Sequence, residues 1–113
     1  MGANKRKNQF KPFVALEREL LKNPAWRSGL TSSEKILYIH LKYKFNGANN
    51  GDICLHYSEM EDIMASATIA KAFKGLEQKE WIERSRTVGG KYRFTTYYKL
   101  TGRYDNAISR FKL

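Results

Sequence analysis

Basic side chains are the most abundant chemically active groups of this sequence, and they gather towards its two ends. Residues 1–11 carry four lysines or arginines and no acid, and residues 84–113 carry eight against the single acid Asp105. These stretches contribute +4 and +7 to a formal net charge of +10, and the residues between them contribute −1. Segregated charge of this kind is typical of a chain that binds a polyanion. The alternative interpretation is a solvated surface that keeps the protein in solution.

Other polar clusters offer little for metal binding or catalysis. Asp52, Cys54 and His56 alternate and would share one face of a strand, but a tight metal site usually gathers three or four ligands. His40 falls among apolar residues of an expected helix, and the acids of residues 59–62 have no nearby base or metal ligand. No glycine-rich phosphate loop precedes a helix. We therefore expect neither enzyme activity, nor a metal site, nor a cofactor.

Segment 66–79 is the element best suited to present basic groups to a partner. Its apolar residues recur with the helical period and form one stripe, made by Ile69, Ala72, Phe73 and Leu76. Ser66 is expected as the N-cap, because its hydroxyl can accept a hydrogen bond from a free N–H of the first turn. The other side of the helix carries the candidate contact residues Ser66, Ala67, Thr68, Ala70, Lys71 and Lys74.

The elements on either side of this helix can be placed by their local patterns. A short helix over 59–64, capped by Ser58, is expected to join it through a turn at Ala65, as in a helix-turn-helix unit. Downstream, Gly89 and Gly90 separate two β-prone runs, which predicts a hairpin. In the second run, residues 92–100, alternate side chains form a packed face and a basic face.

The first half of the chain is expected to supply the core. Residues 17–22 predict a short helix that ends before Pro24, which can begin the next one. Trp26 is expected to anchor the core.

The following helix, opened by a capping box of Thr31 and Glu34, is apolar nearly all round. We expect it to be the buried central helix, with only the side of Lys35 and Lys42 polar, and we expect residues 52–57 to form a strand that pairs with the hairpin.

The order of helix, turn, helix and hairpin resembles the small winged helix-turn-helix proteins of bacteria, phages and plasmids. The resemblance covers about residues 10–101 and is carried by the runs 13–30, 45–53, 68–84 and 97–101. It implies a mainly α fold with a small antiparallel sheet, and it implies DNA binding. Members of the family usually have glycine where Glu80 stands, since the helix exit there often takes a left-handed residue. Glu80 departs from that pattern.

The chain is expected to be one domain with basic extensions. We expect a flexible basic arm over 1–11, a winged-helix domain over 12–101 and a basic C-terminal tail over 102–113. No apolar run approaches the length needed for a membrane span. The single cysteine, Cys54, excludes an internal disulfide and fits a cytoplasmic protein.

The winged-helix interpretation places helix 66–79 in the major groove of double-stranded DNA. Its first three turns contain no Arg, Asn or Gln, so direct base readout is expected to be weak and phosphate contacts to dominate affinity. Besides the helix residues, the expected contacts are Arg86, Lys91 and Arg93 of the hairpin and Lys5, Arg6 and Lys7 of the arm.

Three roles remain open for such a protein. The first is a transcriptional regulator, and the second is a replication-initiation or accessory protein of a plasmid or phage. The third is a module that binds protein or RNA. A homodimer, or a partner protein of replication or transcription, is compatible with these roles.

Overall fold

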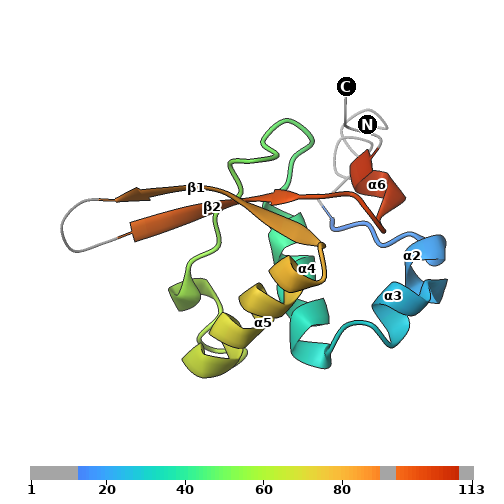
Figure 1. Cartoon of the computed structure of the whole chain (residues 1–113), viewed down its shortest axis with the longest axis horizontal. Coiled ribbons are helices and arrows are strands. Elements are labelled where there is room, and N and C mark those ends of the chain that lie inside the picture. The colour runs from blue at the N-terminus through green and yellow to red at the C-terminus, as the bar shows by residue number, and fades with distance from the viewer. Residues whose placement is uncertain (1–12, 90–93, 110–113) are drawn as a thin grey trace, which may run out of the picture.

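The computed structural model describes residues 13–89 and 94–109, which combine helices with a two-stranded antiparallel sheet (Figure 1). The elements, in chain order, are α2 (Arg18–Lys22), α3 (Pro24–Arg27), α4 (Ser32–Lys44), the 3₁₀ helix η1 (Tyr57–Glu59), α5 (Ser66–Gln78), β1 (Ile82–Gly89), β2 (Phe94–Leu100) and α6 (Asn106–Ser109). No helix in this described part is long and apolar enough to cross a membrane.

Helix α4 packs against α5, and the hairpin of β1 and β2 crosses over both (Figure 1). The short helices α2, α3 and α6 lie at one end of the molecule, while the hairpin projects beyond the other end. The core between these elements is formed by apolar side chains that are almost entirely shielded from water, among them Leu37, Leu41, Ile53, Met60, Ile69, Leu76, Ile82 and Leu100.

Aromatic rings close the core at the end of the short helices. The Trp81 ring centroid lies 5.1 Å from that of Tyr38, 5.8 Å from that of Trp26 and 5.0 Å from that of Tyr104. Tilted and edge-on pairs of this kind add about 0.5–1.5 kcal/mol each to the stabilisation from buried area. The expectation that Trp26 anchors the core is confirmed, and the prediction that Pro24 begins a helix is confirmed as well.

Helix α4 begins as the sequence predicts, but its far half differs. The Thr31 hydroxyl accepts a hydrogen bond from the Glu34 amide at 3.2 Å, and the Glu34 carboxylate accepts one from the Thr31 amide at 2.9 Å. Lys42, expected on the polar side, is buried, whereas Tyr43 is 67 % exposed. The expected polar side was therefore wrong, because Lys42 has an acidic partner inside the protein.

The expected helix over 59–64 is replaced by η1 and a series of turns. A segment of six residues is too short to be helical by itself. The apolar residues that would line the inner side of this helix are Met60, Ile63 and Met64. Met60 is buried, Met64 is partly buried against the core and Ile63 is 43 % exposed, so packing holds only part of the segment. Ser58 lies inside η1, and a Glu59 carboxylate oxygen accepts the His56 amide at 2.9 Å instead.

Two further boundaries differ from the expectation. Ser66 is the first residue of α5 and not its N-cap, which is Ala65. The expected strand over 52–57 is reduced to one bridge, in which Ile53 and Tyr98 exchange backbone hydrogen bonds of 3.2 and 2.7 Å. The chain leaves the sheet after Ile53, because Leu55 turns into the core and η1 follows.

The exit of α5 explains how glutamate replaces the usual glycine. Glu80 has φ 67°, in the left-handed region, and the Trp81 amide donates to the Leu76 carbonyl at 2.9 Å. The Glu80 amide donates to the Glu77 carbonyl at 3.1 Å. These two bonds form a Schellman motif, which satisfies carbonyls at the helix end. The chain therefore adopts the left-handed exit with a residue that has a Cβ and is strained there.

The hairpin is confirmed, although its connection, residues 90–93, lies outside the described residues. Its expected packed face is only partly packed: Tyr98 and Leu100 are buried, while Phe94 is 72 % exposed. The reason is that the strands run past the body of the molecule (Figure 1). A register shift between Arg84 and Arg86 leaves Ser85 unpaired as a β-bulge.

Residues 102–109 belong to the folded body and are not a separate basic tail. Asp105 and Ile108 are each 1 % exposed, and α6 packs against the chain near residue 15 and α4. Gly102, with φ 72°, turns the chain after β2, and its carbonyl accepts the Ser109 hydroxyl at 2.6 Å. The boundary expected at residue 101 was therefore wrong for this part of the segment.

Candidate nucleic-acid interface

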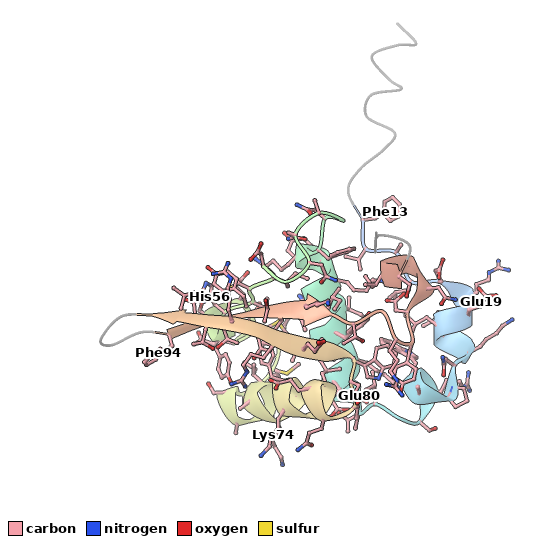
Figure 2. The ribbon with its side chains drawn as sticks, turned by 45° about the horizontal axis from the view of Figure 1, so that its top comes forward. Phe13, Glu19, His56, Lys74, Glu80 and Phe94 are labelled. Carbon is pink, nitrogen blue, oxygen red and sulfur yellow. The ribbon has the colours of Figure 1, made fainter. Side chains whose placement is uncertain are left out.

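The two sides of α5 are divided as the sequence predicts. Ile69, Ala72, Phe73 and Leu76 are buried, whereas Ser66, Ala67, Ala70, Lys71 and Lys74 are exposed. Thr68 is half-buried at the edge of this face. The small side chains at its N-terminal end leave the helix backbone accessible to a bulky partner. Figure 2 shows Lys74 pointing away from the body of the protein.

The two lysines of this face are free of acidic partners among the described residues. Salt bridges in that part of the chain instead bind the cations of Lys42, Lys44, Lys79, Arg84, Arg86 and Arg103. An anionic partner would therefore meet the full charge of Lys71 and Lys74 without first breaking an ion pair. In this respect the two lysines differ from Arg84 and Arg86 of the hairpin, which are both in ion pairs.

A hollow lies between α5 and the start of α4, and Glu34 is one of the residues that line it. The hollow is lined by Thr31, Ser33, Glu34, Thr68, Lys71, Ala72, Lys74, Gly75, Gln78 and Lys79. The Glu34 carboxylate also accepts the Lys79 ammonium at 2.6 Å, which neutralises one cation of the rim. A Cβ on Gly75 would lie 1.8 Å from Glu34 Oε2, so glycine is needed for this close approach.

The β-bulge separates the hairpin arginines onto opposite faces. Arg84 is paired with Tyr98, whose ring stacks on Phe73 of α5 at 5.0 Å, so Arg84 is on the side of α5. Arg86 is paired with Tyr97, on the other face, because the unpaired Ser85 shifts the alternation. The structure therefore does not bring Arg86 together with Lys71 and Lys74.

Arg86 is held on its face by two interactions. Its guanidinium lies 2.7 Å from the Asp52 carboxylate and 4.0 Å from the centre of the Tyr97 ring. The hydrogen bond to Asp52 raises the pKa of Arg86. A phosphate would have to compete with this carboxylate for Arg86, which makes it a weaker candidate contact than the lysines of α5.

Arg84 is the hairpin cation that sequence reasoning missed. It lies 3.1 Å from the Glu77 carboxylate and lines a hollow between α5 and the hairpin, together with Tyr57, Ala70, Phe73, Lys74, Glu77, Gln78 and Tyr98. The hydrogen bond to Glu77 raises the pKa of Arg84. The sequence does place Arg84 two residues after the apolar Ile82, which in a regular strand puts both on one face.

Five of the expected contacts cannot be placed. Lys91 and Arg93 of the hairpin and Lys5, Arg6 and Lys7 of the arm lie outside the described residues.

A second cationic hollow lies among α2, α3 and the start of α4. It is lined by Leu21, Lys22, Pro24, Trp26, Arg27, Ser28 and Lys35, so three cations and no acid surround it. The Lys35 ammonium donates to the Arg27 carbonyl at 3.1 Å. None of its lining residues belongs to α5, so this hollow gives a natural comparison for any test of anion binding.

The polar cluster considered for metal binding is small. Cys54 Sγ lies 3.5 Å from His56 Nε2, and within the described residues no three potential ligands gather. Burial raises the pKa of the Cys54 thiol, which disfavours the thiolate that a metal would need. The nearby Glu59 is occupied by Lys44, and the hydrogen bond from Lys44 lowers the pKa of that carboxyl.

No protein-family model matches the chain, and neither a curated protein nor a solved structure was found to match it.

Proposed function

We propose that this chain is a winged-helix protein that binds double-stranded DNA with the exposed face of α5 in the major groove. The observation that carries the proposal is the pair Lys71 and Lys74, which are exposed and have no acidic partner within residues 13–89 and 94–109, on a helix whose other side is buried. The order of α4, the bridge at Ile53, α5 and the hairpin supports the proposal, although the helix expected over 59–64 is replaced by η1 and turns.

The composition of the face supports binding that is mainly electrostatic. Ala67 and Ala70 can offer only apolar contact to a base edge such as a thymine methyl, and lysine is a point charge that follows phosphates. The first three turns of α5 have no residue that makes bidentate contacts to adenine, and no arginine for guanine. Affinity should therefore fall steeply with salt and vary little between sequences.

The resemblance to winged helix-turn-helix proteins, and not the composition of this face, suggests the physiological role, and we take transcription control as the first candidate. Replication initiation at a mobile element would use the same DNA surface and add partner proteins. Binding of protein or RNA by the basic surface is the candidate from another class. The salt dependence of duplex binding separates the first two roles from the third.

The test compares two double variants by fluorescence anisotropy on a labelled duplex at several salt concentrations. Lys71→Ala with Lys74→Ala removes two charges from α5, and Lys22→Ala with Arg27→Ala removes two from the second cationic hollow. We expect the α5 variant to weaken binding and to reduce the salt slope by about 2, at about 0.9 per phosphate contact. The other variant should bind as the wild type does.

Two results would contradict the proposal. An equal or larger loss in the Lys22 and Arg27 variant would place the polyanion at the second cationic hollow. Duplex binding by the wild type that is absent, or insensitive to salt, would favour the protein or RNA module.

A further inference from the structure

Phe94 is an exposed aromatic side chain on the α5 side of the hairpin, at the far end of the strands. It is paired with Gly89 and shares its face of β2 with Thr96 and Tyr98, because side chains alternate along a strand. Tyr98 is buried against Phe73, whereas Phe94 is 72 % exposed. Figure 2 shows Phe94 near the end of the hairpin, beyond the body of the protein.

Phe94 lies well away from the folded body, along the hairpin. It is four residues beyond Tyr98, the last residue of this face that is buried in the body, which corresponds to about 13 Å of strand. Between the two, Thr96 is paired with Thr87, and their hydroxyls lie 3.5 Å apart. This small, polar pair does not shield the aromatic ring from solvent.

The charge around Phe94 in the sequence indicates an anionic partner. From Arg84 to Leu100 the chain carries five cations and no acid, the cations being Arg84, Arg86, Lys91, Arg93 and Lys99. An aromatic side chain that binds the apolar surface of another protein does not require positive charge around it. Apolar side chains that enter the minor groove of DNA, by contrast, are accompanied by lysine and arginine and partly unstack a base step.

We propose that Phe94 is a wedge that enters the DNA minor groove next to the segment bound by α5 and opens one base step there. This inference rests on the proposed function, because it assigns a second contact to the same duplex. Burial of the ring between bases replaces its exposure to water. Arg84 and Arg86 are paired with Glu77 and Asp52, so the charge that attracts the adjacent phosphates comes from the other cations of this sequence segment, Lys91, Arg93 and Lys99. The wedge bends the duplex and favours pyrimidine–purine steps, which unstack most readily.

Val88 provides the matched control. It is the same kind of exposed apolar residue near the end of the hairpin, 49 % exposed, but it is paired with Thr95 on the opposite face. A wedge that acts on the α5 side needs Phe94 and not Val88. A general need for an apolar hairpin end would affect both residues alike.

The experiment uses the full chain and a duplex with one TA step. Donor and acceptor dyes at the two ends report bending, and 2-aminopurine in place of the adenine of that step reports unstacking. The variants are Phe94→Ala, Phe94→Leu and Val88→Ala. Circular dichroism and the melting temperature of each variant establish that it is folded.

We expect Phe94→Ala to weaken binding about tenfold, as for loss of one aromatic contact with a base, and to abolish both the bend and the 2-aminopurine signal. Phe94→Leu should retain part of each signal, and Val88→Ala should behave as the wild type.

Three results would overturn the inference while leaving the proposed function intact. They are wild-type binding without a bend, an unchanged bend in Phe94→Ala, or an equal loss in Val88→Ala. A change in self-association of Phe94→Ala with unchanged DNA bending would assign the residue to a contact between copies instead. If the wild type does not bind the duplex at all, the proposed function fails, and the inference with it.

Discussion

The buried ion pair between Lys42 and Asp105 is the most exacting test of how this fold is held together. The Lys42 ammonium lies 2.9 Å from Asp105 Oδ2, and the two side chains are 5 % and 1 % exposed. The same ammonium donates to the Ala15 carbonyl at 2.7 Å, and the Tyr38 hydroxyl donates to Asp105 at 2.7 Å. One pair thus joins α4 to segments near both ends of the chain.

Asp105→Asn removes the negative charge and keeps one oxygen acceptor, whereas the carboxylate oxygens accept separately from the Tyr38 hydroxyl and the Ala107 amide. The Lys42 ammonium is then buried without a counter-charge, and breaking a buried pair from one side costs about 3–5 kcal/mol. A domain of this size is stabilised by only about 5–15 kcal/mol. Since each kcal/mol corresponds to about 4–8 °C in domains of 60–100 residues, the melting temperature should fall by at least about 10 °C.

The companion variant Lys42→Met leaves the Asp105 carboxylate buried without its cation, and we expect a loss of similar size. Combining the two substitutions removes both charges, and what remains unsatisfied is the neutral Ala15 carbonyl and the NH2 group of the new amide at position 105. An unsatisfied buried acceptor costs about 1–3 kcal/mol. The double variant should therefore be more stable than either single one, which is a large coupling between the two sites.

Urea unfolding followed by tryptophan fluorescence measures this cycle directly. Trp26 and Trp81 both contact Tyr38, with ring centroids 6.0 and 5.1 Å away, so their emission reports on the packing around the ion pair. Losses that simply add in the double variant, or an Asp105→Asn variant that melts within a degree or two of the wild type, would refute the reasoning. The pair would then be hydrated and of little consequence for stability.

Two further predictions concern the C-terminal end of α5. Gly75→Ala should lower the unfolding free energy by about 1 kcal/mol, because its Cβ displaces Glu34 from the capping box. In a Glu34→Ala background only the difference in helix propensity remains, and the same substitution should raise the unfolding free energy by about 0.5–1 kcal/mol. Stabilisation in both backgrounds, seen in urea unfolding, would show that Glu34 moves aside freely. Glu80→Gly should be about 1 kcal/mol more stable than Glu80→Ala, since both lose the ion pair with Arg103 and only glycine relieves the positive φ. Equal melting temperatures would mean that the left-handed exit carries no strain.

Features that depend on neighbours in the sequence were predictable. The apolar stripe of α5, the capping box of α4 and the helix start at Pro24 each follow from a few adjacent residues, and the structure has all three. Lys42 was not predictable in the same way, because its partner Asp105 is 63 positions away and no local pattern joins them. Without that partner, a lysine on a helix is reasonably expected to face water.

The prediction of a helix over 59–64 was wrong for a related reason. Its pattern of Met60, Ile63 and Met64 fits one face of a helix, yet only Met60 is buried, Met64 packs against the core from its edge and Ile63 is 43 % exposed. A periodic pattern indicates which side would be buried if the helix formed, but a segment of this length depends on tertiary packing to form at all. The sequence contains the pattern and does not reveal how much packing is available.

The charge of the candidate interface shows the same distinction between pattern and placement. The sequence counts Arg84 and Arg86 as equivalent hairpin cations, but a single unpaired residue at Ser85 turns them to opposite faces and gives them different acidic partners. On α5, by contrast, helical geometry fixes Lys71 and Lys74 to one exposed side without an intervening bulge. A sum of charges therefore overstates what the described part of the hairpin offers to phosphate and understates the two lysines of α5. Binding that depended on Arg86 as much as on these lysines would require the Asp52 pair to open first.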